Sequence, residues 1–418
     1  MRNIILASVL LLSFSGAALA QQGGLGAWQN PDIGFVYDLK FDMHNAEVDE
    51  NGDQIWTTRG FNLSTAELNV GAELDPYARI DFNAMFFSDG AEIHELFVTA
   101  HSLPLSLKAR AGQFLASFGR WSQFHSHSMP FASEPRIMHE YLGGHLMPTG
   151  LELSWLAPTD HYIEAFGGVY NSISGHTHDT DPNSSLAAYG PDNLPPGCHF
   201  HGDEIHCPDD PSAEELYRSL VDDPDGPMAP GTNKGISDLA WLGRLQTSFE
   251  MGLDWSMDLG ASLVYQEAFR SSQRFDGTNY SKTTGGVDLT VFWNPVEQNL
   301  YRGLDFGVEY MNNREQDEVL SEANWVKRTS VRDGAFTWAR YRMNRTWDFG
   351  TYYEDFQTMD SSGRRSRVAG FLTWNVSHYQ KIRLEYVHDD RGPYADSVDQ
   401  VILQFDGVIG FHTHGRQR

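Results

Sequence analysis

Cysteine, basic residues and long apolar runs are all scarce in this chain of 418 residues. After the first twenty residues no apolar run approaches the roughly 20 residues that a membrane helix needs, which excludes a helical membrane protein. Acidic residues outnumber basic ones by 56 to 30, and the net charge is -26. This charge excludes nucleic acid as a partner, because phosphates would be repelled. It favours cations as partners, or a solvated acidic surface.

The first twenty residues have the pattern of a cleavable signal peptide, so the predicted mature chain is 21–418. Arg2 gives a positive start, Ile4 to Leu12 form a short apolar run, and Ala18-Leu19-Ala20 is a cleavage site. The alternative, a retained N-terminal anchor, fits less well because the run is short and ends in small residues. The pattern therefore predicts export from the cytoplasm.

The rest of the chain is rich in period-two alternation of apolar and polar residues. Residues 78–86 and 381–386 show it clearly, and aromatic residues reach 13% of the chain. A soluble sandwich also alternates, with apolar residues inside and polar residues outside. A transmembrane barrel alternates in the same way and in addition carries aromatic girdles at both membrane interfaces. The connections between strands must therefore discriminate between the two.

The connections favour the barrel. Sixteen strands are predicted, an even number as expected for a bacterial barrel. Their spans are 33–44, 60–73, 76–88, 91–101, 105–118, 149–157, 161–171, 237–249, 254–268, 284–294, 301–312, 334–343, 346–358, 364–375, 379–389 and 397–411. Short links near residues 75, 103, 158 and 295 alternate with long links at 45–59, 119–148, 172–236, 269–283 and 313–333. The prediction is an all-β fold, a transmembrane antiparallel β-barrel of about sixteen strands with long outer loops, in the outer membrane of a Gram-negative bacterium.

In such a barrel the polar member of each alternating pair faces the lumen. The predicted pore-lining residues carry both signs of charge and are Arg79, Asp81, Lys108, Arg110, Arg340 and Arg342. About sixteen strands would enclose a water-filled channel, and residues 21–32 are too few to form a plug. The surrounding partners would be outer-membrane lipid and lipopolysaccharide, and the assembly could be a homotrimer.

The segment Ala111-Gly112-Gln113-Phe114-Leu115-Ala116-Ser117-Phe118-Gly119 resembles a signature of the phosphate-selective O/P-type porins, which are sixteen-stranded outer-membrane barrels. The following histidine-rich stretches, 124–131 and 139–152, are similar to a branch described as zinc-regulated outer-membrane receptors. The resemblance implies uptake of zinc when zinc is scarce. The chain departs from the phosphate-selective members in having no evident basic cluster in its constriction loop.

Histidine residues gather in the 119–148 segment, which is the third outer loop and the predicted constriction loop. They are His125, His127, His139 and His145, with Glu134 and Glu140 nearby. Imidazole together with carboxylate suits zinc, and also copper or nickel. In an extended chain the two rings of a His-x-His pair lie on the same side and can chelate an ion. The alternative is that these histidines hydrogen-bond to the loop backbone and brace the constriction.

The predicted outer loop 172–236 is the second candidate for metal capture. It contains many acidic residues and the histidines His176, His178, His199, His201 and His206. Short tracts rich in histidine are a compositional signal of metal binding, and the alternative is a solvated acidic loop. Cys198 and Cys207 flank three of these histidines. An oxidising compartment favours a disulfide between them over thiolate ligation.

These patterns predict a porin-like channel for uptake of a divalent metal ion, zinc, with histidine-rich loops that capture the ion. The alternative is a general or anion-selective porin whose histidines are incidental. An enzyme is not expected, because the sequence identifies neither a Ser–His pair nor three close ligands with an open metal position. Zinc enters this account as a transported or transiently bound ion.

Overall fold

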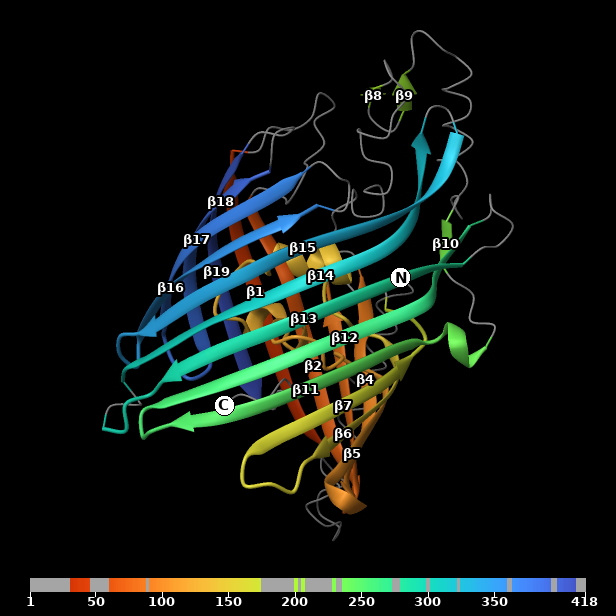
Figure 1. Ribbon diagram of the computed structural model, residues 1–418. Helices are drawn as coiled ribbons and strands as arrows, with labels where there is room; N and C mark the ends of the chain where they lie inside the picture. The colour runs from red at the N-terminus through yellow and green to blue at the C-terminus, as the bar shows by residue number, and fades with distance from the viewer. Residues whose placement is uncertain are drawn as a thin grey trace, which may run out of the picture.

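The computed structural model describes residues 31–45, 60–87, 90–173, 199–201, 204–206, 228–230, 235–272, 279–297, 301–321, 324–358, 363–391 and 397–410. Within these ranges sixteen long antiparallel strands form one closed barrel (Figure 1). The barrel closes because β1 pairs with β2 on one side and with β19 on the other. This confirms the predicted fold class and the strand number.

The long strands are β1 (Asp32–His44), β2 (Gly60–Asp75), β3 (Ala78–Phe86), β4 (Ala91–Leu103), β5 (Leu107–Gln113), β6 (Thr149–Leu156), β7 (Tyr162–Tyr170), β11 (Ala240–Met251), β12 (Trp255–Ser272), β13 (Asn279–Trp293), β14 (Gly303–Ser321), β15 (Asn324–Arg342), β16 (Trp347–Gln357), β17 (Arg364–Asn375), β18 (Gln380–Asp390) and β19 (Val398–Gly410). The short strand β10 (Met228–Pro230) extends the sheet beside β12, and β8 (His199–His201) pairs only with β9 (Glu204–His206). Single 3-10 turns occur at η2 (Pro104–Ser106) and η7 (Ile236–Asp238).

One predicted long link, 313–333, is wrong. Strand β14 continues to Ser321 and β15 begins at Asn324, and the two strands pair without interruption from Gly303↔Arg342 to Ser321↔Asn324. The sequence there is rich in charged residues, so the apolar member of each alternating pair is often missing. The strand pair keeps its ladder hydrogen bonds there, although the sequence lacks the alternation of apolar and polar residues that the prediction used.

The two faces of the wall differ as the alternation predicts. On β16, Phe349 and Tyr353 are exposed on the outside, whereas Tyr352 and Glu354 are buried on the inside. Near the short turns the outer face carries tryptophan pairs, with ring centroids 5.9 Å apart for Trp347 and Trp374. Aromatic residues at this height are typical of the membrane interface of a barrel.

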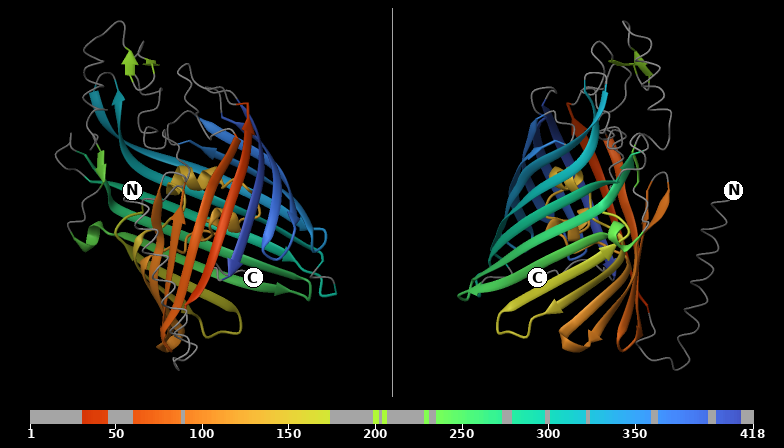
Figure 2. Two further views of the ribbon diagram at one scale, coloured as in Figure 1. Left: turned by 180° about the vertical axis from the view of Figure 1, so that it is seen from behind. Right: turned by 45° about the vertical axis from the view of Figure 1, so that its right-hand side comes forward.

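The segment between β5 and β6 folds into the barrel (Figure 2). It contains the 3-10 turns η3 (Trp121–Gln123) and η4 (Ser126–Ser128) and the helix α2 (Arg136–Leu142). No helix among the described residues is long and apolar enough to cross a membrane. We call residues 114–148 the inner loop.

The inner loop forms an apolar core against the barrel wall. The ring of Phe131 lies 5.4 Å from that of Phe336 and 5.5 Å from that of Tyr352, and the ring of Trp121 lies 5.0 Å from that of Trp338. The prediction of a polar, water-filled lumen is therefore wrong at the level of the loop. Period-two alternation identifies which residues face inward, but it does not reveal that a loop will cover inward aromatic residues.

Candidate metal centre

Glutamate side chains of the barrel wall hold the inner loop in place. Each accepts hydrogen bonds from backbone amides of the loop, which would otherwise be buried without partners. The contacts are Leu115 N to Glu95 (2.9 Å), Ser117 N to Glu152 (3.0 Å), Arg120 N to Glu309 (3.2 Å), Ala132 N and Ser133 N to Glu385 (2.6 and 3.1 Å), and Ile137 N to Glu354 (3.2 Å). The loop is thus attached to several separate strands, which fixes the position of its side chains.

Gly119 makes room for the carboxylate of Glu309 beside the loop backbone. It has a φ of 54°, and a Cβ atom there would lie 1.8 Å from Oε1 of Glu309. Its amide donates to Oγ of Ser262 over 3.1 Å. A side chain at this position would displace the carboxylate that accepts from the next amide of the chain.

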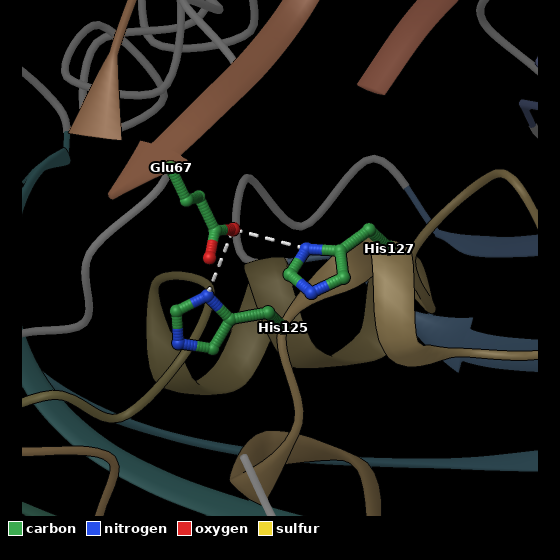
Figure 3. Close-up of side chains that lie close together, drawn as sticks. All are labelled: Glu67, His125 and His127. Carbon is green, nitrogen blue, oxygen red and sulfur yellow. Dashed lines mark hydrogen bonds and ion pairs between the residues drawn. The ribbon is translucent and has the colours of Figure 1, made fainter. Parts of the chain in front are cut away.

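The first candidate site joins the wall to the inner loop. Oε1 of Glu67, on β2, lies 2.9 Å from Nδ1 of His127 and 3.2 Å from Nδ1 of His125 (Figure 3). All three side chains are at most 2% exposed. His125 ends an extended stretch and His127 lies in η4, so both rings of the His-x-His pair turn toward the same carboxylate. We call these three residues the central group.

Charge and burial act against each other at His125. Burial acts to lower the pKa of its imidazole, but the carboxylates of Glu67 and Glu95 more than offset burial and raise this pKa to about 9. His125 is thus paired with a carboxylate on each side, Glu67 at Nδ1 and Glu95 at Nε2.

A β-bulge on β4 supplies the second group of candidate ligands. Asn83 pairs with Glu95 while the next residue, Ala84, pairs with Ile93, so His94 is the extra residue of the bulge. The bulge turns both His94 and Glu95 into the barrel, as such irregularities often do beside functional sites. Nε2 of His125 lies 3.4 Å from Oε2 of Glu95, and its ring centroid lies 4.5 Å from that of His94.

The residues His94, Glu95 and His125 offer ligand atoms within 4.8 Å of one another, as do the members of the central group. We call His94, Glu95 and His125 the inner group. Both groups are buried, and they share His125. The shared ring presents Nδ1 to one group and Nε2 to the other.

The remaining loop histidines meet at Glu134. Its Oε2 lies 2.9 Å from Nε2 of His139, and its Oε1 lies 3.0 Å from Nε2 of His145. Burial favours the neutral acid, but the imidazoles of His145 and His139 hold the pKa of Glu134 well below its usual range. The ring of His145 lies 6.4 Å from that of His125. We call Glu134, His139 and His145 the outer group.

The loop residues predicted as metal ligands therefore lie in the three groups, with one exception. His125, His127, His139 and His145 lie in the three groups, whereas Glu140 belongs to none of them, and Glu134 is the loop carboxylate between the histidines. The sequence did not identify Glu67, His94 and Glu95 as candidate ligands, because they lie on wall strands. Glu67 was identifiable as facing the lumen, but its distance from the loop histidines depends on how the loop folds.

The predicted capture loop is only partly described. The backbones of β8 and β9 pair with His199 opposite His206 and His201 opposite Glu204. The remaining candidates of that loop, His176, His178 and the Cys198–Cys207 bridge, lie outside the described residues, as does the predicted signal peptide.

A cavity of 1190 Å³ lies between the inner loop and the short turns. All six predicted pore-lining residues, Arg79, Asp81, Lys108, Arg110, Arg340 and Arg342, line it. Opposite charges pair within it, as in the 2.6 Å contact of Arg110 with Glu152 and the 2.9 Å contact of Arg79 with Asp81. This mixture of signs does not by itself select cations or anions.

Two distances within the central group are close to the spacing of ligands around a metal ion. Ligand atoms about 2.0–2.1 Å from a tetrahedral zinc ion lie about 3.3 Å from one another. The distances of 2.9 and 3.2 Å between Glu67 and the two Nδ1 atoms are close to this spacing. Two nitrogens and one oxygen suit zinc, copper or nickel by donor type.

Comparisons with known proteins agree with the fold. No family model matches the sequence. A protein of Aquifex aeolicus described as uncharacterized is 24% identical in an alignment that covers 92% of this chain and 79% of the relative. The outer membrane channel DcaP of Acinetobacter baumannii superimposes with a TM-score of 0.54 at 10% identity, over 93% of this chain and 99% of that one. The anion-selective porin from Comamonas acidovorans gives 0.51 at 11% identity, over 91% and 99%.

These likenesses show that the chain has the fold of an outer-membrane porin. The identities are too low to say more than the fold. The narrower resemblance, to the O/P-type porins and their histidine-rich zinc-regulated branch, stays a prediction.

Proposed function

We propose that the protein is an outer-membrane channel for the uptake of a divalent metal ion, zinc, and that its inner loop binds the ion during passage. The observation that carries this proposal is the central group, in which one wall carboxylate oxygen lies within 3.2 Å of two loop imidazole nitrogens. A wall residue and two loop residues converge on one point, and all three side chains offer atoms that can bind a metal ion.

The electrostatics of the chain support a cation as the substrate. The net charge of -26 attracts cations to the protein and repels anions. Conduction also requires ligands that release the ion, so several small groups suit a channel better than one closed cage of four ligands. The complete burial of Glu67 leaves little room for a second substrate beside the metal, which argues against a hydrolytic zinc site.

Equilibrium zinc binding by the folded full-length protein tests the proposal. We expect wild-type protein to bind zinc and the double variant His125→Ala/His127→Ala to lose the tight site. Zinc reversal potentials across a planar bilayer should show cation preference. Absence of zinc binding by the wild-type protein would refute the proposal.

The second candidate function is a general or anion-selective porin. The mixed charges of the cavity permit it, and one protein with the same fold is described as an anion-selective porin. In that case the histidine groups only brace the loop. A reversal potential with clear anion preference, unchanged by zinc, would decide for this alternative.

A further inference from the structure

We infer that the metal ion crosses the inner loop in steps, from the outer group through the central group to the inner group, and that His125 passes it between the last two. This inference rests on the proposed function and adds the route. In this route the metal ion passes through the inner loop itself and not through a gap between the loop and the barrel wall.

The first support is the position of His125 between two carboxylates of the wall. Nδ1 lies 3.2 Å from Glu67 and Nε2 lies 3.4 Å from Glu95, so each nitrogen of one ring belongs to a different group of three ligands. Two divalent ions held this close would repel each other. The two groups therefore suit alternate occupation by one ion, as in multi-site conduction.

The second support is that the outer group and the inner group lie toward opposite ends of the barrel. Glu95 lines the cavity beside the short turns, whereas the cavity lining does not include Glu67, His94, His125 or His127. At the other end, α2 carries His139 and is attached through Tyr141, whose hydroxyl donates to the carbonyl of Gln357 over 3.0 Å. Gln357 is the last residue of β16 and lies at the end of the barrel that carries the long links. The outer group thus faces the outside and Glu95 faces the cavity.

Burial changes along the same series. The side chains of Glu134 and His139 are 14% and 12% exposed, those of His145 and His125 are 2% and 1% exposed, and that of Glu95 is 6% exposed. The outer group is therefore the most accessible and the central group is fully buried, whereas in the inner group Glu95 is slightly more exposed than His125 and His94 is 1% exposed. An ion that leaves water would enter at the outer group and reach the cavity through Glu95.

His145 connects the outer group with the rest. Its Nε2 contacts Glu134, its ring lies 6.4 Å from that of His125, and its buried Nδ1 has no hydrogen-bond partner within the part of the chain that the structure describes. A buried imidazole nitrogen without a partner is costly unless it has a ligand for part of the time. A passing metal ion would supply that ligand.

The test uses full-length protein in liposomes that enclose a zinc-sensitive dye, together with equilibrium zinc binding. The variants are Glu134→Gln, His125→Ala and Glu95→Gln. The matched control is Glu164→Gln, because Glu164 lines the same cavity without belonging to any histidine group. Glutamine at position 95 can still accept from the amide of Leu115, so the loop anchor stays.

We expect His125→Ala to lose both binding and flux. Glu95→Gln should keep zinc bound at the central group but lower the flux about tenfold, because a ligand on the way out is weakened. Glu134→Gln should also keep zinc bound at the central group, and should lower the flux most when external zinc is dilute. The control should conduct zinc like the wild type.

Two outcomes separate failure of the route from failure of the function. If wild-type protein binds zinc and His125→Ala does not, but all variants conduct zinc equally, the ion passes around the loop and the inferred route is wrong. If wild-type protein neither binds nor conducts zinc, the proposed function fails and the route with it.

Discussion

Oε1 of Glu67 lies 2.9 Å from Nδ1 of His127, so a residue of the barrel wall and a residue of the inner loop share one buried point. Neither residue could hold a metal ion alone. The fold brings them together because the loop enters the lumen and is held beside β2 by the nearby strand β18, where Lys381 donates to the carbonyl of His127 over 2.5 Å.

Removal of the charge at Glu67 should weaken zinc binding. The substitution Glu67→Gln keeps the shape of the side chain but replaces an anionic ligand by a neutral one, and we expect a loss of affinity of about 10- to 100-fold. Isothermal titration with zinc measures it. Glu164→Gln, in the cavity, serves as the control and should bind zinc with wild-type affinity; an equal loss in both variants would point to a general charge effect.

The anchor at Glu385 should control how firmly the loop is held. Glu385→Ala leaves the amides of Ala132 and Ser133 buried without an acceptor, at a cost of about 1–3 kcal/mol for each. We expect faster hydrogen exchange at these two amides and a larger single-channel conductance. Glu385→Gln keeps one acceptor oxygen and should show a smaller effect; wild-type exchange in the alanine variant would show that the anchor is dispensable.

The apolar core should also hold the loop. Phe131 is 1% exposed and contacts Trp121, Phe336 and Tyr352 through its ring. We expect Phe131→Ala to destabilise the loop by about 3–5 kcal/mol and Phe131→Leu by less. Hydrogen exchange of the loop amides compares the two variants, with barrel amides as the internal reference. Equal loosening of the barrel amides would mean that Phe131 stabilises the whole fold.

The predicted capture loop should matter only when zinc is dilute. Replacement of His176, His178, His199, His201 and His206 by alanine removes imidazoles that would concentrate the ion near the channel mouth. We expect a lower zinc flux into liposomes at low external zinc and an unchanged flux at saturation. The same fractional loss at every zinc concentration would assign these histidines another role.

The barrel could be predicted from the sequence because each strand of its wall shows a local pattern, the alternation of apolar and polar residues. Alternation and the parity of short and long links located all sixteen strands. The largest differences are that β14 and β15 extend beyond the predicted ends, that β13 begins at Asn279 instead of 284, and that β5 ends at Gln113, so residues 114–118 belong to the inner loop and not to the predicted strand 105–118. The sequence of the β14 and β15 extensions is rich in charged residues and poor in apolar ones, so it shows no alternation.

The candidate site could be predicted only in part. The clustering of His125, His127, His139 and His145 was visible in the sequence because they are close in the chain. The wall ligands were not visible, since Glu67 is brought to them by long-range packing and His94 faces inward only because of a bulge that breaks the period of two. The apolar core around Phe131 was missed for the same reason, as its partners come from distant strands.

The single-channel current in a planar bilayer, recorded with and without zinc, tests the central claim most directly. The two proteins to compare are the wild type and the variant in which His125, His127, His139 and His145 are all replaced by alanine. We expect cation selectivity and a zinc-dependent change of conductance in the wild type, and loss of the zinc dependence in the variant. Equal conductance with and without zinc in both proteins would contradict the account.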